Sequence, residues 1–140
     1  MIDLENDLIQ YVGDALRSEF NGIEVAGTYV SAPSRFPFVS IIESDNRIFD
    51  RMRTVRIENA AIVMYECNIY SNKVSGKKQE AKAIANTLDE AFESAGFTRT
   101  MRNQVANLND ASIYRIVCRY EAVVAPSADG KFLVYQSNYY

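Results

Sequence analysis

Residues 107–124, NLNDASIYRIVCRYEAVV, decide the fold class of this 140-residue chain. The stretch begins as a polar turn and then alternates in polarity. Successive side chains of a β-strand point to opposite faces of a sheet, so this run predicts a strand with one apolar face. The apolar face carries Tyr114, Ile116, Cys118, Tyr120, Ala122 and Val124. The other face includes Arg115, Arg119 and Glu121, which either meet solvent or contact a partner.

Two other segments predict strong strands. NAAIVMYECNIYS, residues 59–71, has the same alternation, with Ala61, Val63, Tyr65, Cys67 and Ile69 on one face. FVSII, residues 38–42, follows Pro37. Proline lacks the amide hydrogen that a sheet ladder needs, so Pro37 belongs at the start or at an exposed edge of this strand.

Weaker signals predict two more strands. IEVAGTYV, residues 23–30, is extended in character, and KFLVYQ, residues 131–136, follows the hairpin signal Asp129-Gly130. Residues 44–58 have no clean period, and we interpret them as a long, mobile connection.

Helical spacing appears twice. Residues 3–20 repeat apolar side chains every three or four positions, and Asn21-Gly22 follows where a helix should end. Residues 75–96 have an apolar stripe, with Ser75 placed to cap the start and Gly96 to end the helix. The stripe consists of Ala81, Ile84, Ala85, Leu88, Ala91 and Phe92.

This order of elements predicts an α+β fold with a mixed or antiparallel sheet and two main helices packed largely on one face. The length is that of a single domain over residues 1–140. Within it, we expect a core over residues 1–126 and a hairpin with a C-terminal tail over residues 127–140.

The composition argues against several function classes. The chain has no histidine, and its two cysteines, Cys67 and Cys118, fall on separate predicted strands, so we expect no metal site, no cofactor and no enzymatic activity. Buried, reduced thiols are the expected state of both cysteines. A formal net charge of −3 argues against general nucleic-acid binding. No apolar run approaches the ~20 residues that cross a bilayer, and the acidic N-terminus is unlike a signal peptide, so we expect folding in a cytoplasm.

Charge is unevenly distributed along the chain. The first 24 residues are acidic, whereas residues 47–56 are basic. The acids include Asp3, Asp7 and Asp14, and the basic residues are Arg47, Arg51, Arg53 and Arg56. Segments of opposite sign can pair within one molecule or between two copies of it.

Several stretches together resemble one family. They are FPFVSIIESDNR (36–47), VMYECNIYSNKVSGKKQEAKAIANTLDEAFESAGFTRT (63–100) and NLNDASIYRIVCRYEAVV (107–124). In order and content they resemble the tail-terminator, or tail-completion, proteins of long-tailed bacteriophages and prophages, which are often labelled minor capsid proteins. The resemblance covers about residues 4–126.

The resemblance implies a structural subunit of the virion, made in the host cytoplasm, that assembles into a ring, usually a hexamer, at the head-proximal end of the tail. Such a ring stops polymerisation of the tail tube and offers a surface to the head connector, while DNA passes through its lumen without sequence readout. The partners are therefore further copies of the chain, the tail tube protein and a head-completion protein, with no membrane involved. The family has no catalytic residues to transfer.

A ring needs head-to-tail contacts between two different faces of the subunit. The interface residues that we predict are Arg47, Arg51, Arg53, Arg56, Arg115, Arg119, Glu121, Asp3, Asp7 and Asp14. Two alternatives remain: another neck component, such as a head-completion or joining protein, and a DNA-binding module. The second would use the arginines at 47–56 and 115–119 together with Arg99 and Arg102.

Overall fold

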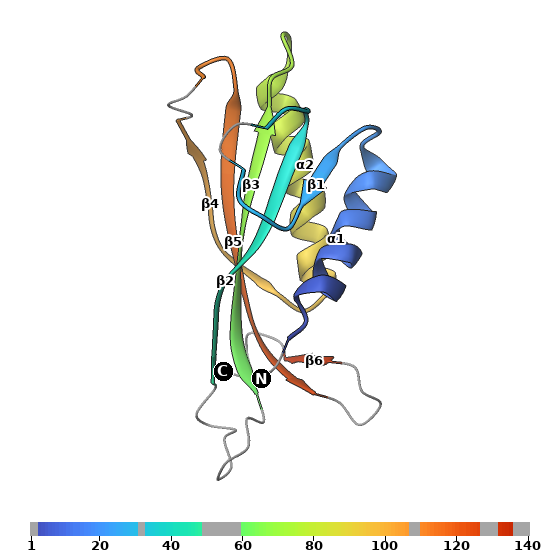
Figure 1. Cartoon of the computed structure of the whole chain (residues 1–140), viewed down its shortest axis with the longest axis vertical. Helices are drawn as coiled ribbons and strands as arrows, with labels where there is room; N and C mark the ends of the chain where they lie inside the picture. Colours follow the sequence, from blue (N-terminus) through green and yellow to red (C-terminus); the bar gives the residue numbers. More distant parts are fainter. Residues whose placement is uncertain (1–2, 31–32, 49–59, 107–109, 127–131, 136–140) are drawn as a thin grey trace.

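The computed structural model describes residues 3–30, 33–48, 60–106, 110–126 and 132–135. Two helices and six strands follow one another along the chain (Figure 1). In order they are α1 (Glu5–Glu19), β1 (Glu24–Ala26), β2 (Phe38–Ile48), β3 (Ala61–Ser71), α2 (Lys77–Ser94), β4 (Thr98–Val105), β5 (Tyr114–Pro126) and β6 (Phe132–Tyr135).

All six strands belong to one mixed sheet. The order is β1-β2-β3-β5-β4, and β6 pairs with β5 beside this path. β1 runs parallel to β2, and the other pairs are antiparallel. Both helices lie on the same side of the sheet in Figure 1, as the shared core requires. The predicted α+β class and the placement of the helices are therefore confirmed.

The core lies between the helices and the sheet face that we call the inner face. It contains the apolar sides of β3 and β5 in the predicted phase, together with the stripe of α2. Phe92 of α2 stacks on Tyr120 of β5 with ring centroids 4.1 Å apart and planes 2° from parallel. Burial of Ile84, Leu88 and Phe92 contributes about 1.5–3 kcal/mol for each side chain.

The helix ends agree with the sequence in part. Gly22 after α1 and Gly96 after α2 both have positive φ, as expected of residues that terminate helices. The prediction that Ser75 caps α2 is wrong. The helix begins at Lys77, its N-cap residue is Gly76 with φ 92°, and no side chain of the described residues caps it.

Two features of the sheet were not predicted. Residues 44–48 were expected in a connection but continue β2. The sequence did not predict this continuation because a bulge between Glu43 and Asp45 shifts the alternation. The remainder of the predicted connection, residues 49–58, lies outside the described residues. β4, Thr98–Val105, was not predicted because it is a mostly exposed edge strand with little apolar content.

The weaker strand predictions are confirmed in shortened form. β1 covers Glu24–Ala26, and β6, Phe132–Tyr135, pairs with β5. Pro37 stands immediately before β2, as predicted. The hairpin signal Asp129-Gly130 and the tail from residue 136 lie outside the described residues. Neither described helix has the length and apolar content needed to cross a membrane.

Candidate interaction surface

The sheet face opposite the helices, which we call the outer face, carries the charged side of β5. The register places the outer-face residues in rows across the strands. One row consists of Ile42, Glu66, Arg119 and Met101. Charged side chains in such rows lie beside their cross-strand neighbours, so the first question is whether they pair within the chain.

Arg119 has a partner directly opposite it. Its Nε and Nη2 atoms each lie 3.0 Å from Glu66 Oε1. The Arg119 side chain is 47% exposed, so solvent screens this ion pair. The ion pair orients the Arg119 side chain but leaves it accessible to solvent.

Arg115 is fixed by a polar and an aromatic contact. Its Nε and Nη2 atoms donate to Asn68 Oδ1 over 3.0 and 2.6 Å. Its guanidinium carbon lies 5.7 Å from the centroid of the Tyr70 ring, within the range of a cation–π contact. Burial raises the pKa of Tyr70, and the charge of Arg115 opposes that shift.

Part of the outer face is covered. Asn68 and Tyr70 are almost completely buried, as is Ser40 on β2. Figure 1 draws the described residues between β1 and β2, 27–30 and 33–37, in front of this end of the sheet, and Tyr29 lies near enough to Tyr70 to act on the pKa of Tyr70. Among the residues that the structure describes, the Oγ atom of Ser40 and the Nδ2 atom of Asn68 have no hydrogen-bond partner.

Arg47 is the one arginine of the basic segment 47–56 that lies within the described residues. Its Nη1 atom lies 2.6 Å from Asp45 Oδ2, and its Nη2 atom lies 3.9 Å from Glu121 Oε1. The contacts of Arg47 are therefore with β2 and β5 rather than with the acids of α1. Arg51, Arg53 and Arg56 lie outside the described residues.

The predicted acids of the N-terminal segment lie in and just before α1. Asp3 accepts a hydrogen bond from the backbone of Glu5, and Asp14 pairs with Arg17 on the same helix. Asp7 is exposed in the first turn. The structure does not bring these three acids against Arg47, Arg115 or Arg119. Their role in contacts between copies stays a prediction.

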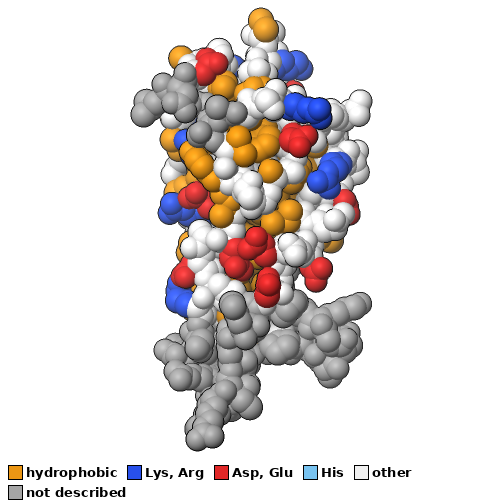
Figure 2. All heavy atoms as spheres, in the orientation of Figure 1, with side chains coloured by type: hydrophobic (Ala, Val, Ile, Leu, Met, Phe, Trp, Pro, Cys, Tyr) orange, Lys and Arg blue, Asp and Glu red, His pale blue; other side chains and the backbone are white. Residues whose placement is uncertain are grey.

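An acidic group that the sequence did not reveal forms where α1 begins beside β2. Glu43 accepts a hydrogen bond of 3.1 Å from the hydroxyl of Tyr65. Partial burial raises the pKa of Glu43, the Tyr65 bond opposes this, and the charges of Glu5 and Asp3 raise the pKa further. Figure 2 shows acidic side chains gathered near the lower end of the described part of the molecule. The sequence did not predict Glu43 as a strand residue, because the bulge that follows it interrupts the alternation.

The opposite edge of the sheet is basic. Arg99 of β4 pairs with Asp89 of α2 at 2.7 Å, and Arg102 donates to Asn86 Oδ1 over 2.9 Å. A second donor of Arg102, Nη2, reaches the Lys82 carbonyl. Both arginines therefore lie on the inner face, beside α2. From the sequence, these two arginines were expected to act only in the DNA-binding alternative, because β4 was not predicted.

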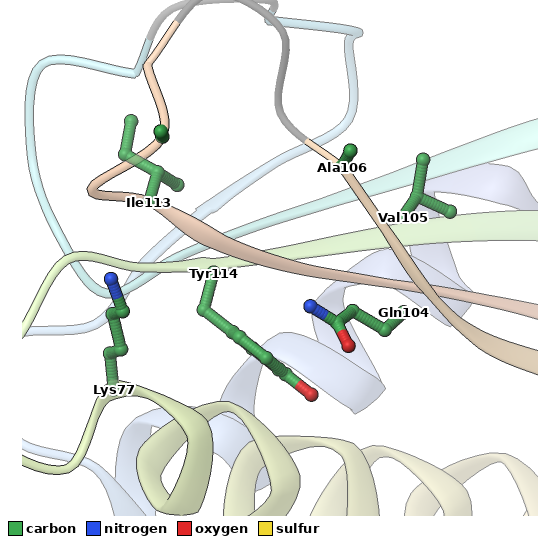
Figure 3. Close-up of a pocket in the computed structure, with 7 residues that line it drawn as sticks. Lys77, Gln104, Val105, Ala106, Ile113 and Tyr114 are labelled. Atoms are coloured by element: carbon green, nitrogen blue, oxygen red, sulfur yellow. The ribbon is translucent and has the colours of Figure 1, made fainter.

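A shallow pocket of about 280 Å³ lies between the start of α2 and the ends of β4 and β5 (Figure 3). Lys77 Nζ donates to the Ser112 carbonyl over 3.1 Å and so ties the helix to the turn before β5. Gln104, Val105 and Tyr114 are among the lining residues. The lysine serves as a structural tie here. Across the described residues, no group of three metal-binding side chains comes together.

The two cysteines face each other across β3 and β5. Cys67 and Cys118 are directly paired in the register, and both are buried free thiols, as predicted. Burial raises the pKa of Cys67 well above its ordinary value and that of Cys118 to about 11. Both thiols are therefore protonated near neutral pH and poorly nucleophilic.

A comparison with models of protein families finds none that matches this chain, and a search of curated proteins finds no match either.

Proposed function

We propose that this chain is a structural protein of a bacteriophage virion, a tail terminator. Its copies form a ring, hexameric as in the family it resembles, at the head-proximal end of the tail. The ring ends polymerisation of the tail tube and presents a joining surface to the head-completion or connector protein. DNA passes through the lumen without sequence readout. The chain is made in the host cytoplasm and has no catalytic role.

The observation that carries this proposal is the charge difference between the two sides of the subunit. One side carries Asp3, Glu5 and Glu43 around the start of α1 and the adjacent part of β2. The other side carries Arg99 and Arg102 on β4. A closed ring of identical subunits needs two different, complementary surfaces on each copy, and opposite charge is one way to provide them.

The internal partners of the outer-face arginines also support a structural role. Arg115 and Arg119 are held by Asn68 and Glu66 within the same chain. Arginine side chains held in this way present a fixed arrangement of charge to a protein partner. Nucleic-acid binding, in contrast, depends mainly on cations that release counterions from phosphates.

The test is to add the purified chain to tail tubes that are still growing and to examine them by electron microscopy. We expect rings on one end of each tube and tubes that stop lengthening. The matched comparison uses tailless heads in place of tubes. Binding to heads without capping of tubes would overturn the terminator role in favour of a joining protein.

A gel shift separates the DNA-binding alternative. We expect no retardation of duplex DNA at low salt. Retardation that falls steeply as salt rises would support the alternative instead.

A further inference from the structure

A groove of about 330 Å³ runs between the two helices. On each helix its lining residues recur every three or four positions, so they share one face of that helix. Half of them are alanine or serine, and these small side chains leave the space between the helices open. The lining consists of Tyr11, Ala15, Ser18 and Glu19 of α1 and of Thr87, Glu90, Ala91 and Ser94 of α2.

Tyr11 forms an apolar wall of this groove. Its side chain is half exposed, and its hydroxyl oxygen lies 2.6 Å from Ser94 Oγ. Ser94 Oγ has one hydrogen and donates it to the Ala91 carbonyl, so the Tyr11 hydroxyl is the donor in the bond to Ser94. The Tyr11 ring is therefore held in place while part of it stays exposed. Tyrosine is enriched in protein interfaces.

Two carboxylates add negative charge to the groove. Glu19 of α1 and Glu90 of α2 line it, and both are exposed. The groove therefore offers an apolar surface beside acidic groups. Its complement is a partner that carries an apolar side chain next to cations.

The turn between β3 and α2, residues 72–76, has this character. Figure 1 shows the turn projecting beyond the sheet at one end of the molecule. Val74, at the centre of the turn, is fully exposed. Among the described residues, the only other exposed large hydrophobic side chains are Tyr11 and Tyr29. Lys73 and Lys78, on either side of Val74 in the chain, are exposed as well.

The charges at both ends of α2 favour the same partners. Lys77 and Lys78 begin the helix, whereas Glu90 and Glu93 lie near its end, where the last turn has no basic residue. A helix dipole favours the opposite arrangement, with anions at the start and cations at the end. A neighbouring copy that brings its lysines to the acidic end of α2 supplies the missing cations.

We propose that the turn of residues 72–76 in one copy inserts Val74 into the groove between α1 and α2 of the next copy. Lys73 and Lys78 then lie beside Glu19 and Glu90 of that neighbour. This proposal rests on the ring function and names one contact between adjacent subunits. The turn and the groove are different surfaces of the chain, so the contact is head-to-tail, as a ring requires.

The turn cannot fill the groove of its own copy. α2 begins at Lys77, and its first groove residue is Thr87, ten residues later. This separates the turn from the groove by about 15 Å along a rigid helix. In a closed ring, two parts in contact lie at the same height along the rotation axis. The contact therefore requires α2 to run across the ring axis rather than along it.

Cross-linking between two introduced cysteines tests the contact directly. Ser18 in the groove and Ser75 in the turn are exposed, and the two native cysteines are buried. The variant S18C/S75C, treated with a short bismaleimide, should give a ladder of covalent multimers, both as the concentrated free chain and on capped tail tubes. S18C and S75C alone should give no more than dimers. The matched control is S75C/N103C, because Asn103 is exposed on β4, and it should give no ladder.

The outcomes separate this contact from the ring function. Tubes that are capped but give no ladder with S18C/S75C overturn the contact and leave the function intact. A ladder from a chain that does not cap tubes overturns the function and supports the contact between copies. Loss of capping in a groove variant that never gives a ladder would assign the groove to the tail tube or the connector, and would also overturn the contact.

A charge exchange provides a second test. Glu90→Lys and, separately, Lys73→Glu should each weaken assembly several-fold, and the double variant E90K/K73E should recover part of the loss. The matched control, E90K/K82E, makes the same charge changes but leaves the turn intact, because Lys82 lies further along α2. It should show no recovery. Equal loss in both double variants would overturn the charge pairing between turn and groove.

Substitution of Val74 tests the apolar part of the contact. Val74→Asp should weaken assembly at least about ten-fold, because it replaces an apolar side chain that the contact withdraws from water. The midpoint of urea unfolding of the single subunit should not change, because Val74 is fully exposed there. Asn103→Asp adds the same charge at an exposed position of β4 and should leave assembly unchanged. Unaltered assembly of Val74→Asp in sedimentation would overturn the insertion of Val74.

Discussion

Arg119 and Glu66 stand directly opposite each other on β5 and β3 and form an ion pair on the outer face of the sheet. The charged side of the strand that decides the fold is therefore satisfied within the chain. Mutation of Arg119 can therefore have two separate effects. Loss of its partner inside the subunit lowers the free energy of unfolding, whereas loss of a partner in another copy weakens assembly.

Removing this ion pair should cost little in the isolated subunit. We expect Arg119→Ala to lower the free energy of unfolding by about 0–1 kcal/mol, because exposed ion pairs are screened by water. Reversal of Arg115 and Arg119 together should leave the monomer folded but impair ring formation. Urea unfolding and sedimentation measure the two effects. Normal rings from the doubly reversed variant would assign both arginines to a solvated surface.

Two buried serines should respond oppositely to the same substitution. Ser40 Oγ is buried and has no hydrogen-bond partner in the described part of the chain, so Ser40→Ala should raise the free energy of unfolding by about 1 kcal/mol. Ser71, equally buried, donates to Glu80 Oε1 over 2.7 Å, so Ser71→Ala should lower it by about 1–2 kcal/mol. Chemical denaturation measures both. A loss of stability in both variants would contradict the assignment of Ser40 as unpartnered.

The hydroxyl of Tyr120 should stabilise the packing of α2 on β5. It donates to Asp89, while its ring stacks on Phe92. Tyr120→Phe keeps the stack and removes the donor, so we expect the free energy of unfolding to fall by about 1.5–3 kcal/mol, the range for hydrogen bonds to charged groups. Tyr29→Phe, at an exposed tyrosine, is the control and should change stability by less than about 0.5 kcal/mol. Thermal unfolding followed by circular dichroism measures the difference.

Glu43 should make stability depend on pH. Its pKa in the folded chain is raised above the ordinary value of 4.5, so the folded state holds the proton more tightly than the unfolded state. Stability therefore falls as pH rises from about 4.5 through the folded pKa. Glu43→Gln removes this term while its amide oxygen can still accept from Tyr65. We expect the variant to gain stability relative to the parent between pH 4 and pH 7 in urea titrations. A constant difference over that range would contradict the raised pKa.

The thiols should report opening of the core. Cys67 and Cys118 are buried, and burial raises the pKa of both, so a thiol reagent at neutral pH should label the native chain only as fast as it opens. Urea should accelerate labelling in proportion to unfolding. Rapid labelling without denaturant would show that this part of the sheet opens locally.

Alternating and helical polarity determined the main elements of this protein. The phase of β3 and β5, the apolar stripe of α2 and the glycines that end both helices follow from local rules, because side-chain direction and backbone freedom depend on neighbours in the chain. The buried cysteines follow for the same reason, since each belongs to an apolar strand face.

Only the tertiary structure decided the features that now define the candidate surface. The bulge after Glu43 breaks the alternation, so the far half of β2 has no local signal. β4 is stabilised by its pairing with β5 and by the contacts of Arg99 and Arg102 with α2. The polar sequence of β4 does not predict these contacts, because they join elements that are separate along the chain. The partners of Arg47, Arg115 and Arg119 depend on strand register, which joins residues far apart in sequence. Local patterns therefore determined the elements, whereas strand order and register decided which charges meet.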